Sequence, residues 1–286
     1  MIVVFGSTGT IGSEVLRQLV EQGPPVRAVV RSQQAADRLA GGSTEVVRAD
    51  LADPGSLPAA LAGADRVFLA TPASAEQVRL ESNLIDALAG SSVPLVKLAA
   101  LGFDAVPADQ AIALAANHGR IVEHARAQGV ALTVLAPSGF TSNLLASAGT
   151  IAQGALYGSA GDGGVAWVDP ADVGAVAAHV LTSSGHEGAT YSVTGPDLLT
   201  FAQLAELLTA ELGREVSYVD VPAGQFAQTL QGAGLDAWTA DALDELHQLY
   251  RAHLSEVVTD EVSKATGRKP RSVQQWLAEH AAAFAG

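Results

Sequence analysis

Three glycines, spaced three residues apart near the start of the chain, are the first residues whose pattern indicates chemistry. The segment reads Gly6-Ser7-Thr8-Gly9-Thr10-Ile11-Gly12, between an apolar run and an amphipathic stretch. In such a strand–loop–helix unit the first glycine permits a tight turn. The second lets the backbone approach a pyrophosphate, and the third lets helix and strand pack closely. Free N–H groups at the helix start, aided by the helix dipole, would bind the phosphates of a dinucleotide.

The residue after the second β-rich run, 26–30, indicates which dinucleotide is bound. Arg31 stands nineteen residues after Gly12, Ser32 follows it, and no acidic residue appears before Asp37. An acid at this place holds the ribose 2′-hydroxyl of NAD, whereas an arginine accommodates a 2′-phosphate through its guanidinium. We therefore expect NADP(H). The alternative is an ordinary solvated arginine at a strand end.

Two residue pairs directly follow the third and fourth β-rich runs. We expect Asp50 to accept a hydrogen bond from the adenine amino group and Leu51 to pack on the ring; alternatively, Asp50 only caps a turn. Thr71 and Pro72 stand where the pyrophosphate and the nicotinamide ribose would pass the carboxyl edge of a parallel sheet.

The elements that must position these residues alternate along the first half of the chain, which is typical of βαβ units. The expected strands are residues 2–5, 26–30, 45–48, 66–70, 94–99 and 131–135. The expected helices are residues 11–21, 33–40, 56–61, 76–89 and 111–128. Right-handed crossovers give the strand order 3-2-1-4-5-6. We therefore predict an α/β fold, with a Rossmann-type doubly wound parallel sheet over residues 1–135 that binds the dinucleotide.

The pattern changes from Ala136 onward. After a loop with many turn-forming residues, a seventh strand is expected at residues 165–168, and Asp169 is expected to cap a helix over residues 171–182. Further strands are expected at residues 190–193 and 216–221, a helix at 201–212, and mainly helices after that. Residues 136–286 are thus predicted to form a smaller substrate lobe, interleaved with the end of the sheet.

Composition limits the partners of the chain. Its formal net charge is −14, and residues 151–286 hold 17 acidic against 6 basic residues. Nucleic acid and membrane lipid are unlikely partners because binding them requires a basic face. No apolar run approaches the roughly 20 residues of a membrane span. With no cysteine and no ligand spacing among the histidines, no metal site is expected. Since the chain starts with a strand and not a signal peptide, we expect a cytoplasmic protein. We expect it to be a monomer or homodimer.

These motifs resemble the NmrA-like branch of the atypical short-chain dehydrogenases over nearly the whole chain. The similarity also includes Asn117-His118 with Glu123, Leu135–Phe140 with Asn143, Asp172-Val173-Gly174, Leu199-Thr200-Phe201, and Thr266-Gly267-Arg268 with Trp276. It is strongest to the quinone oxidoreductase and triphenylmethane dye reductase group. The resemblance implies that His118 touches the nicotinamide ribose or donates a proton, a structural histidine being the alternative. It also implies that Phe140 and Asn143 line a substrate pocket.

One feature of ordinary short-chain dehydrogenases is missing. Their Tyr-x-x-x-Lys dyad supplies an acid for a substrate oxygen. The three lysines here are Lys97, Lys264 and Lys269, and four positions before them stand Val93, Asp260 and Ala265. We therefore expect an NAD(P)H-dependent reductase whose small-molecule hydride acceptor is electron-poor and conjugated, such as a quinone or aryl dye. The alternative is an NADP(H)-binding redox sensor without turnover.

Overall fold

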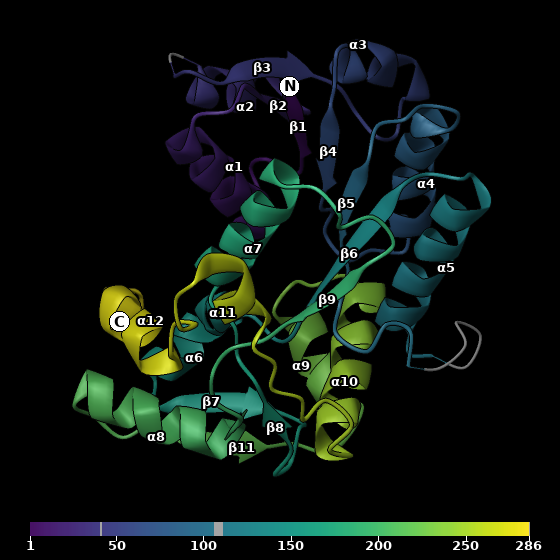
Figure 1. Cartoon of the computed structure of the whole chain (residues 1–286). Coiled ribbons are helices and arrows are strands. Elements are labelled where there is room, and N and C mark those ends of the chain that lie inside the picture. Colours follow the sequence, from purple (N-terminus) through teal and green to yellow (C-terminus); the bar gives the residue numbers. More distant parts are fainter. Residues whose placement is uncertain (41, 106–110, 286) are drawn as a thin grey trace.

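A computed structural model of the chain describes residues 1–40, 42–105 and 111–285. Within these segments, seven parallel strands form one sheet in the order β3-β2-β1-β4-β5-β6-β9 (Figure 1). The strands are β1 (Ile2–Phe5), β2 (Val26–Val30), β3 (Glu45–Arg48), β4 (Arg66–Leu69), β5 (Leu95–Leu98), β6 (Leu132–Pro137) and β9 (Thr190–Val193). The Rossmann-type fold and the predicted order of the first six strands are confirmed.

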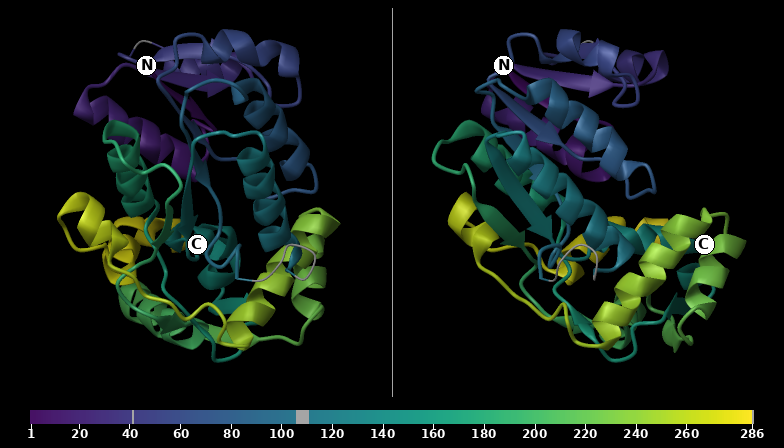
Figure 2. Two further views of the ribbon diagram at one scale, coloured as in Figure 1. Left: turned by 45° about the vertical axis from the view of Figure 1, so that its right-hand side comes forward. Right: turned by 90° about the vertical axis from the view of Figure 1, so that its right-hand side faces the viewer.

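Helices cover both faces of this sheet, as Figures 1 and 2 show. They are α1 (Thr10–Gln22), α2 (Gln33–Leu39), α3 (Leu57–Leu61, after the short turn η1, Pro54–Ser56), α4 (Gln77–Leu88), α5 (Ala113–Ala127), α7 (Pro170–Thr182) and α11 (Glu261–Thr266). Successive strand residues face opposite sides. In β1, Val3 and Phe5 pack with α3, α4 and α5. Ile2 and Val4 pack with α1, α7 and α11 on the other face.

The seventh strand of the sheet is β9, which pairs with β6. The prediction of a seventh strand at residues 165–168 is wrong. Only Gly164–Val165 forms a strand there, β8, which pairs antiparallel with β10 (Leu199–Thr200) in a separate sheet, while Val168 makes an isolated bridge with Phe140. Trp167 and Val168 are buried in the cores of the protein. Their apolar character therefore comes from packing and not from membership of the main sheet.

The remaining elements lie below the sheet in Figure 1, around a third apolar core. They are η2 (Thr141–Ser147), α6 (Ala148–Ala152), β7 (Ala155–Gly158), α8 (Phe201–Leu212), β11 (Ser217–Asp220), α9 (Gln225–Gly232), α10 (Ala237–Arg251), α12 (Val273–His280) and η3 (Ala281–Phe284). Strands β7 and β11 pair in parallel. We call these elements the lower lobe. The chain division at residues 135/136 stays a prediction. Beyond it, α7 and β9 return to the sheet.

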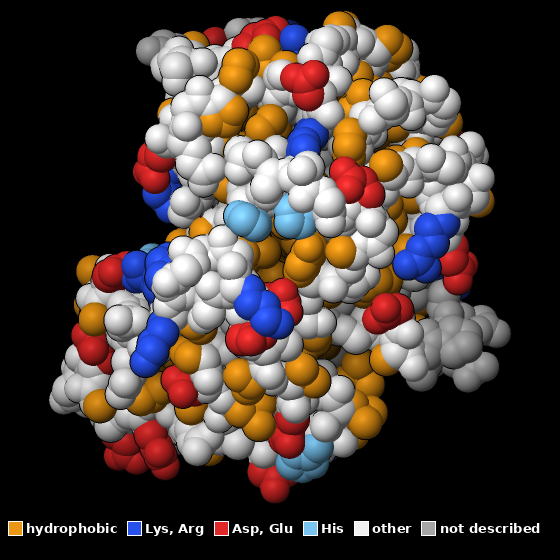
Figure 3. Space-filling view, viewed as in Figure 1, with side chains coloured by type: hydrophobic (Ala, Val, Ile, Leu, Met, Phe, Trp, Pro, Cys, Tyr) orange, Lys and Arg blue, Asp and Glu red, His pale blue; other side chains and the backbone are white. Residues whose placement is uncertain are grey.

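Asp169 caps α7 as predicted, because its carboxylate accepts a hydrogen bond from Ala171 N at 2.8 Å. None of the described helices combines the length and the apolar character that crossing a bilayer requires. On the face drawn in Figure 3, the Lys and Arg side chains lie apart from one another and form no continuous patch.

Candidate active site

The glycine loop connects β1 to α1 at the carboxyl edge of the sheet. Gly6 has a φ of +80°, a left-handed conformation that favours glycine. A Cβ on Gly12 would lie 2.0 Å from the carbonyl oxygen of Gly6, so the helix could not approach the strand as it does. A Cβ on Gly9 would meet nothing closer than 3.4 Å, which leaves that side of the loop open. The conformation and surroundings of the three glycines therefore fit the roles that a dinucleotide phosphate loop requires, and their contact with a cofactor stays a prediction.

Two of the other loop residues are buried and anchor the loop to the protein, and two are exposed to solvent. Ser7 is buried, and its hydroxyl donates to the carbonyl of Val29 at 2.8 Å, which fixes the loop to β2. Ile11 is buried in the core beneath α1. Thr8 and Thr10 are exposed, and no side chain among the described residues caps α1. The N–H groups of its first turn therefore remain available to an anionic ligand, and the residues present fit a pyrophosphate.

Arg31 and the Asp50-Leu51 pair lie at the same edge, after β2 and β3. Arg31 is exposed, next to the α2 cap Ser32, so its guanidinium is accessible. Asp50 Oδ1 accepts a hydrogen bond from Ala52 N at 2.9 Å and thus caps a turn, as the alternative interpretation had it. Leu51 packs against the core. The roles of these residues toward a cofactor stay predictions.

A cavity of about 250 Å³ opens beyond the carboxyl ends of β4, β5 and β6. Its wall combines the ends of these strands with α4, α5 and the lower-lobe helix α10. Of the predicted site residues, Thr71, His118, Phe140 and Asn143 line it together, whereas Pro72 is exposed and lies outside the wall. The structure thus brings four residues from three separate segments of the sequence to one site.

His118 on α5 is buried at the cavity wall, and its ring orientation is fixed. Its Nδ1 lies 3.0 Å from Lys97 Nζ. Because an ammonium group can only donate, Nδ1 must accept, which puts the proton of the neutral ring on Nε2. Nε2 has no hydrogen-bond partner among the described residues, yet it is not one of their fully buried, unpartnered polar atoms. It therefore keeps accessible surface, and because His118 lines the cavity, that surface faces the cavity. Burial first, and then the Lys97 charge, hold the pKa of His118 well below 6.5, so the ring is neutral near pH 7.

Lys97 lies behind His118 and belongs to a network that is sealed from solvent. Its Nζ pairs with Glu81 Oε2 at 3.0 Å, and neither side chain is exposed. It also donates to the carbonyl of Leu98 at 2.8 Å. Glu81 Oε1 accepts hydrogen bonds from Thr71 Oγ1 at 2.5 Å and from Gln77 Nε2 at 3.2 Å. Burial lowers the pKa of Lys97, and the Glu81 carboxylate opposes that shift. We call Thr71, Gln77, Glu81, Lys97 and His118 the cavity network.

Lys97, Glu81 and Gln77 are not among the residues predicted from the sequence. Lys97 is two residues after Leu95 on a buried strand, so the two face the same, apolar side. Glu81 shares the buried stripe of α4 with Leu84 and Ile85. Charged residues on apolar faces are rarely buried unless paired. The sequence therefore indicated that Lys97 and Glu81 would need charged partners. It did not indicate that they would pair with each other.

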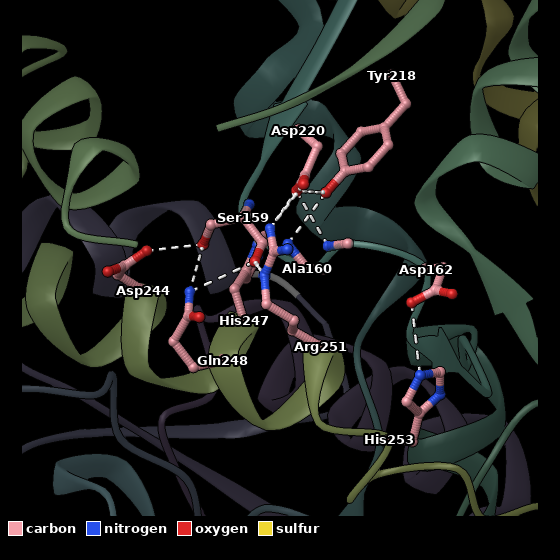
Figure 4. Close-up of polar contacts among 11 residues, drawn as sticks. Ser159, Ala160, Asp162, Tyr218, Asp220, Asp244, His247, Gln248, Arg251 and His253 are labelled. Carbon is pink, nitrogen blue, oxygen red and sulfur yellow. Dashed lines mark hydrogen bonds and ion pairs between the residues drawn. The ribbon is translucent and has the colours of Figure 1, made fainter. Parts of the chain in front are cut away.

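A second polar network holds α10 against β7 and β11 in the lower lobe (Figure 4). Ser159 donates from its hydroxyl to Asp244 Oδ1 at 2.7 Å and from its backbone N–H to His247 Nδ1 at 3.1 Å. Asp244 Oδ2 accepts from Gly224 N at 2.7 Å. Arg251 pairs with both carboxylate oxygens of Asp220, at 2.6 and 2.7 Å. We call Ser159, Asp220, Asp244, His247, Gln248 and Arg251 the lobe network. Since α10 also lines the cavity, this network fixes part of its wall.

A model of the NmrA-like family matches residues 1–277. The chain belongs to the NmrA-like family. The resemblance predicted from the sequence is therefore confirmed.

Two curated relatives and one solved structure are similar to this NmrA-like protein over most of its length. It is 39% identical over 285 residues to an NAD(P)H azoreductase of Xenophilus azovorans, covering 99% of each chain. It is 32% identical over 248 residues to quinone oxidoreductase 2 of Escherichia coli, covering 85% of each. An NADPH complex of the Escherichia coli quinone oxidoreductase has a TM-score of 0.89 at 28% identity, covering 98% of this chain and 99% of that one.

No group of three or more His, Asp or Glu side chains with the geometry of a metal site occurs in the described part of this NmrA-like protein.

Proposed function

We propose that this NmrA-like protein is an NAD(P)H-dependent reductase that transfers hydride to a small conjugated acceptor of the quinone or aryl dye type. The observation that carries the proposal is the position of the cavity. It opens at the carboxyl edge of the sheet, the same edge as the glycine loop, where a dinucleotide that starts on the loop would place its nicotinamide. Relatives that are an azoreductase and a quinone oxidoreductase support this assignment.

NADP(H) is the proposed cofactor, and when bound it supplies the hydride. The glycine loop would hold its pyrophosphate, Arg31 its 2′-phosphate, and Asp50 with Leu51 its adenine. Losing a charged phosphate contact is worth about 1.5–3 kcal/mol, or roughly 10- to 150-fold in affinity. Calorimetry should therefore find that Arg31→Ala weakens NADPH binding by that factor and leaves NADH binding unchanged. Arg38→Ala, an exposed arginine on the neighbouring α2, is the matched control and should change neither.

The wall of the cavity suits a flat, largely apolar acceptor. Leu98, Leu101, Leu114 and Leu243 provide apolar surface. Phe140 and Asn143 would contact the acceptor from the segment after β6. Positioning such an acceptor over the nicotinamide contributes to the rate through proximity and orientation. The proposed partner is thus a small molecule and not nucleic acid, and we propose a cytoplasmic monomer or homodimer.

Oxidation of NADPH with a panel of acceptors tests this function. The panel contains a quinone, an azo dye, a cationic triarylmethane dye and a simple ketone. We expect turnover with the conjugated acceptors and little with the ketone. Efficient ketone reduction would contradict the proposed acceptor class. Tight NADPH binding without oxidation of any acceptor would instead support the second candidate, a redox-sensing binding protein.

A further inference from the structure

Four side chains connect two points of the cavity wall through the protein interior. Thr71 and His118 line the cavity, whereas Glu81 and Lys97 lie behind them with no exposed surface. Every link in this chain is a hydrogen bond or ion pair of 3.0 Å or less. A continuous polar path therefore starts and ends at the proposed acceptor site.

Stability alone gives no good reason for this arrangement. Burying two charges removes their hydration, and apolar residues of similar volume usually replace such a pair without loss. Lys97 and Glu81 also do more than neutralise each other's charge. Besides its contacts with Glu81 and Leu98, Lys97 contacts the accepting nitrogen of His118. That contact selects one of the two neutral forms of the ring, the form with its proton on the nitrogen accessible from the cavity.

We propose that Lys97 is a positioning residue that holds His118 as the proton donor to the acceptor and supplies the proton that replaces the one donated. Glu81 keeps Lys97 charged, and Thr71 and Gln77 hold Glu81. The inference deepens the proposed function and rests on it. It assigns to this network the acid role for which ordinary short-chain dehydrogenases use their Tyr-x-x-x-Lys dyad.

The proton balance is clearest for an azo acceptor. One nitrogen gains the hydride that the cofactor supplies, and the π electron pair of the N=N bond moves to the second nitrogen. That nitrogen takes the proton from His118 Nε2, while Nδ1 takes a proton from Lys97 Nζ. The azo group is thereby reduced by two electrons to a hydrazine, the cofactor is oxidised, and Lys97 is left as a neutral amine. After the product leaves, water in the cavity returns the proton by the same path.

Two charged groups on the helices α4 and α10, which pack against α5, are engaged elsewhere. On α4, Asp86 pairs with His124 at 2.7 Å. On α10, Glu245 accepts a hydrogen bond from the backbone N–H of Ala113 at 2.8 Å. Among the described residues, Lys97 is the charged group within hydrogen-bond distance of the His118 ring.

A comparison of two acceptors in one variant tests the proposal. A cationic triarylmethane dye becomes neutral on taking up hydride and needs no proton, whereas an azo dye does. The variant Glu81→Gln/Lys97→Met removes both buried charges at similar volume, so that it folds even where Lys97→Met alone does not. We expect its kcat with the azo dye to fall at least about 100-fold, as for loss of general acid catalysis. Its kcat with the cationic dye should change less than about threefold.

Lys264→Met is the matched control. Like Lys97, Lys264 pairs with carboxylates, but its two partners and the lysine itself lie on the surface. It should behave as wild type with both dyes. Equal losses with the azo and the cationic dye in the double variant would overturn the proposal.

Nitrogen NMR of the histidine rings gives a readout that needs no turnover. In the wild-type protein without cofactor, His118 should be neutral with its proton on Nε2, and in the double variant this preference should be lost. A wild-type signal with the proton on Nδ1 would overturn the proposal. If the wild type reduces neither the two dyes nor a quinone, the proposed function fails, and the NMR result alone then decides the role of Lys97.

Discussion

The cavity network and the lobe network are built from similar residues, yet they differ in what they leave unpaired. Each combines a carboxylate, a hydroxyl and a buried histidine whose pKa burial depresses. In the lobe network, no side-chain nitrogen or oxygen is both buried and without a partner. In the cavity network, Gln77 Oε1 is buried and unpartnered, Glu81 Oε2 is buried with an ion pair to Lys97 but no hydrogen bond, and His118 Nε2 opens on the cavity.

That difference separates two uses of buried polar groups. A network in which every buried side-chain nitrogen and oxygen has a partner specifies one arrangement of the elements it joins. The lobe network does this for α10, β7 and β11. A network with unpaired groups at a cavity retains donors and acceptors for a ligand. We therefore expect substitutions in the lobe network to change mainly stability, and those in the cavity network to change function as well.

The largest effect is expected from Glu81→Gln in the cavity network. The substitution leaves Lys97 buried without its counter-charge, and breaking such a pair costs about 3–5 kcal/mol of unfolding free energy. Adding Lys97→Met should restore most of this loss, because the second charge is then removed as well. Urea unfolding of the single and double variants measures both steps. A single variant as stable as wild type would mean that Lys97 is neutral in the folded protein.

The next effect is expected in the lobe network, from Asp244→Ala. The carboxylate accepts hydrogen bonds from Ser159 Oγ and Gly224 N, and removing an acceptor of buried donors costs about 2–3 kcal/mol. Turnover per folded molecule should stay within about twofold. Asp241→Ala, an exposed aspartate on the same helix, is the control for stability. A large drop in turnover without loss of stability would give this network a role in the reaction and remove the contrast.

Acid should weaken the lobe network through His247. Burial lowers the pKa of His247 to about 4, whereas an unfolded histidine titrates near 6.5. The contribution is complete above about pH 6.5. It is lost as the pH falls toward 4, since the unfolded chain then binds a proton that the folded chain does not. Between about pH 7.5 and 5 the loss from His247 is about 2 kcal/mol.

His247→Gln tests this origin, because an amide can accept the Ser159 N–H bond but does not titrate. The fall in unfolding free energy from pH 7.5 to 5 should be smaller in the variant by about the same 2 kcal/mol. His118, whose pKa is also lowered, acts in the same direction and remains in both proteins. An unchanged pH dependence would show that His247 titrates normally.

The sequence predicted what depends on local pattern. Alternating apolar runs and the glycine spacing place six strands in the right order and mark the phosphate loop. The strand predicted at residues 165–168 was wrong because an apolar run indicates that a segment is buried but not which secondary structure it forms. The cavity network was beyond reach for a similar reason. Lys97 and His118 are 21 residues apart on a strand and a helix, and only the packing of α4 and α5 on the sheet makes them partners.

The smallest and most selective effect is expected from Gln77, where the two networks differ most directly. Gln77 is 1% exposed, and its Nε2 makes one long hydrogen bond to Glu81, while Oε1 has no partner in the described residues. An unpaired buried acceptor opposes folding by about 1–3 kcal/mol, which offsets the bond that the amide donates. Gln77→Leu should therefore change the unfolding free energy by less than about 1 kcal/mol. Other atoms of Gln77 line the cavity but Oε1 itself is sealed, so this oxygen accepts from a bound cofactor or acceptor only after the amide turns toward the cavity. The variant should raise the Kd for NADPH or the KM for the acceptor about three- to tenfold, the worth of one hydrogen bond.

Gln248→Leu is the matched control in the lobe network, where the amide donates to Ser159 Oγ at 3.1 Å. It should lower stability by about 1 kcal/mol and leave both constants unchanged. If Gln77→Leu instead leaves Kd and KM at their wild-type values, Gln77 Oε1 opposes folding and binds no ligand. The cavity network would then offer ligands no more unpaired groups at this position than the lobe network does.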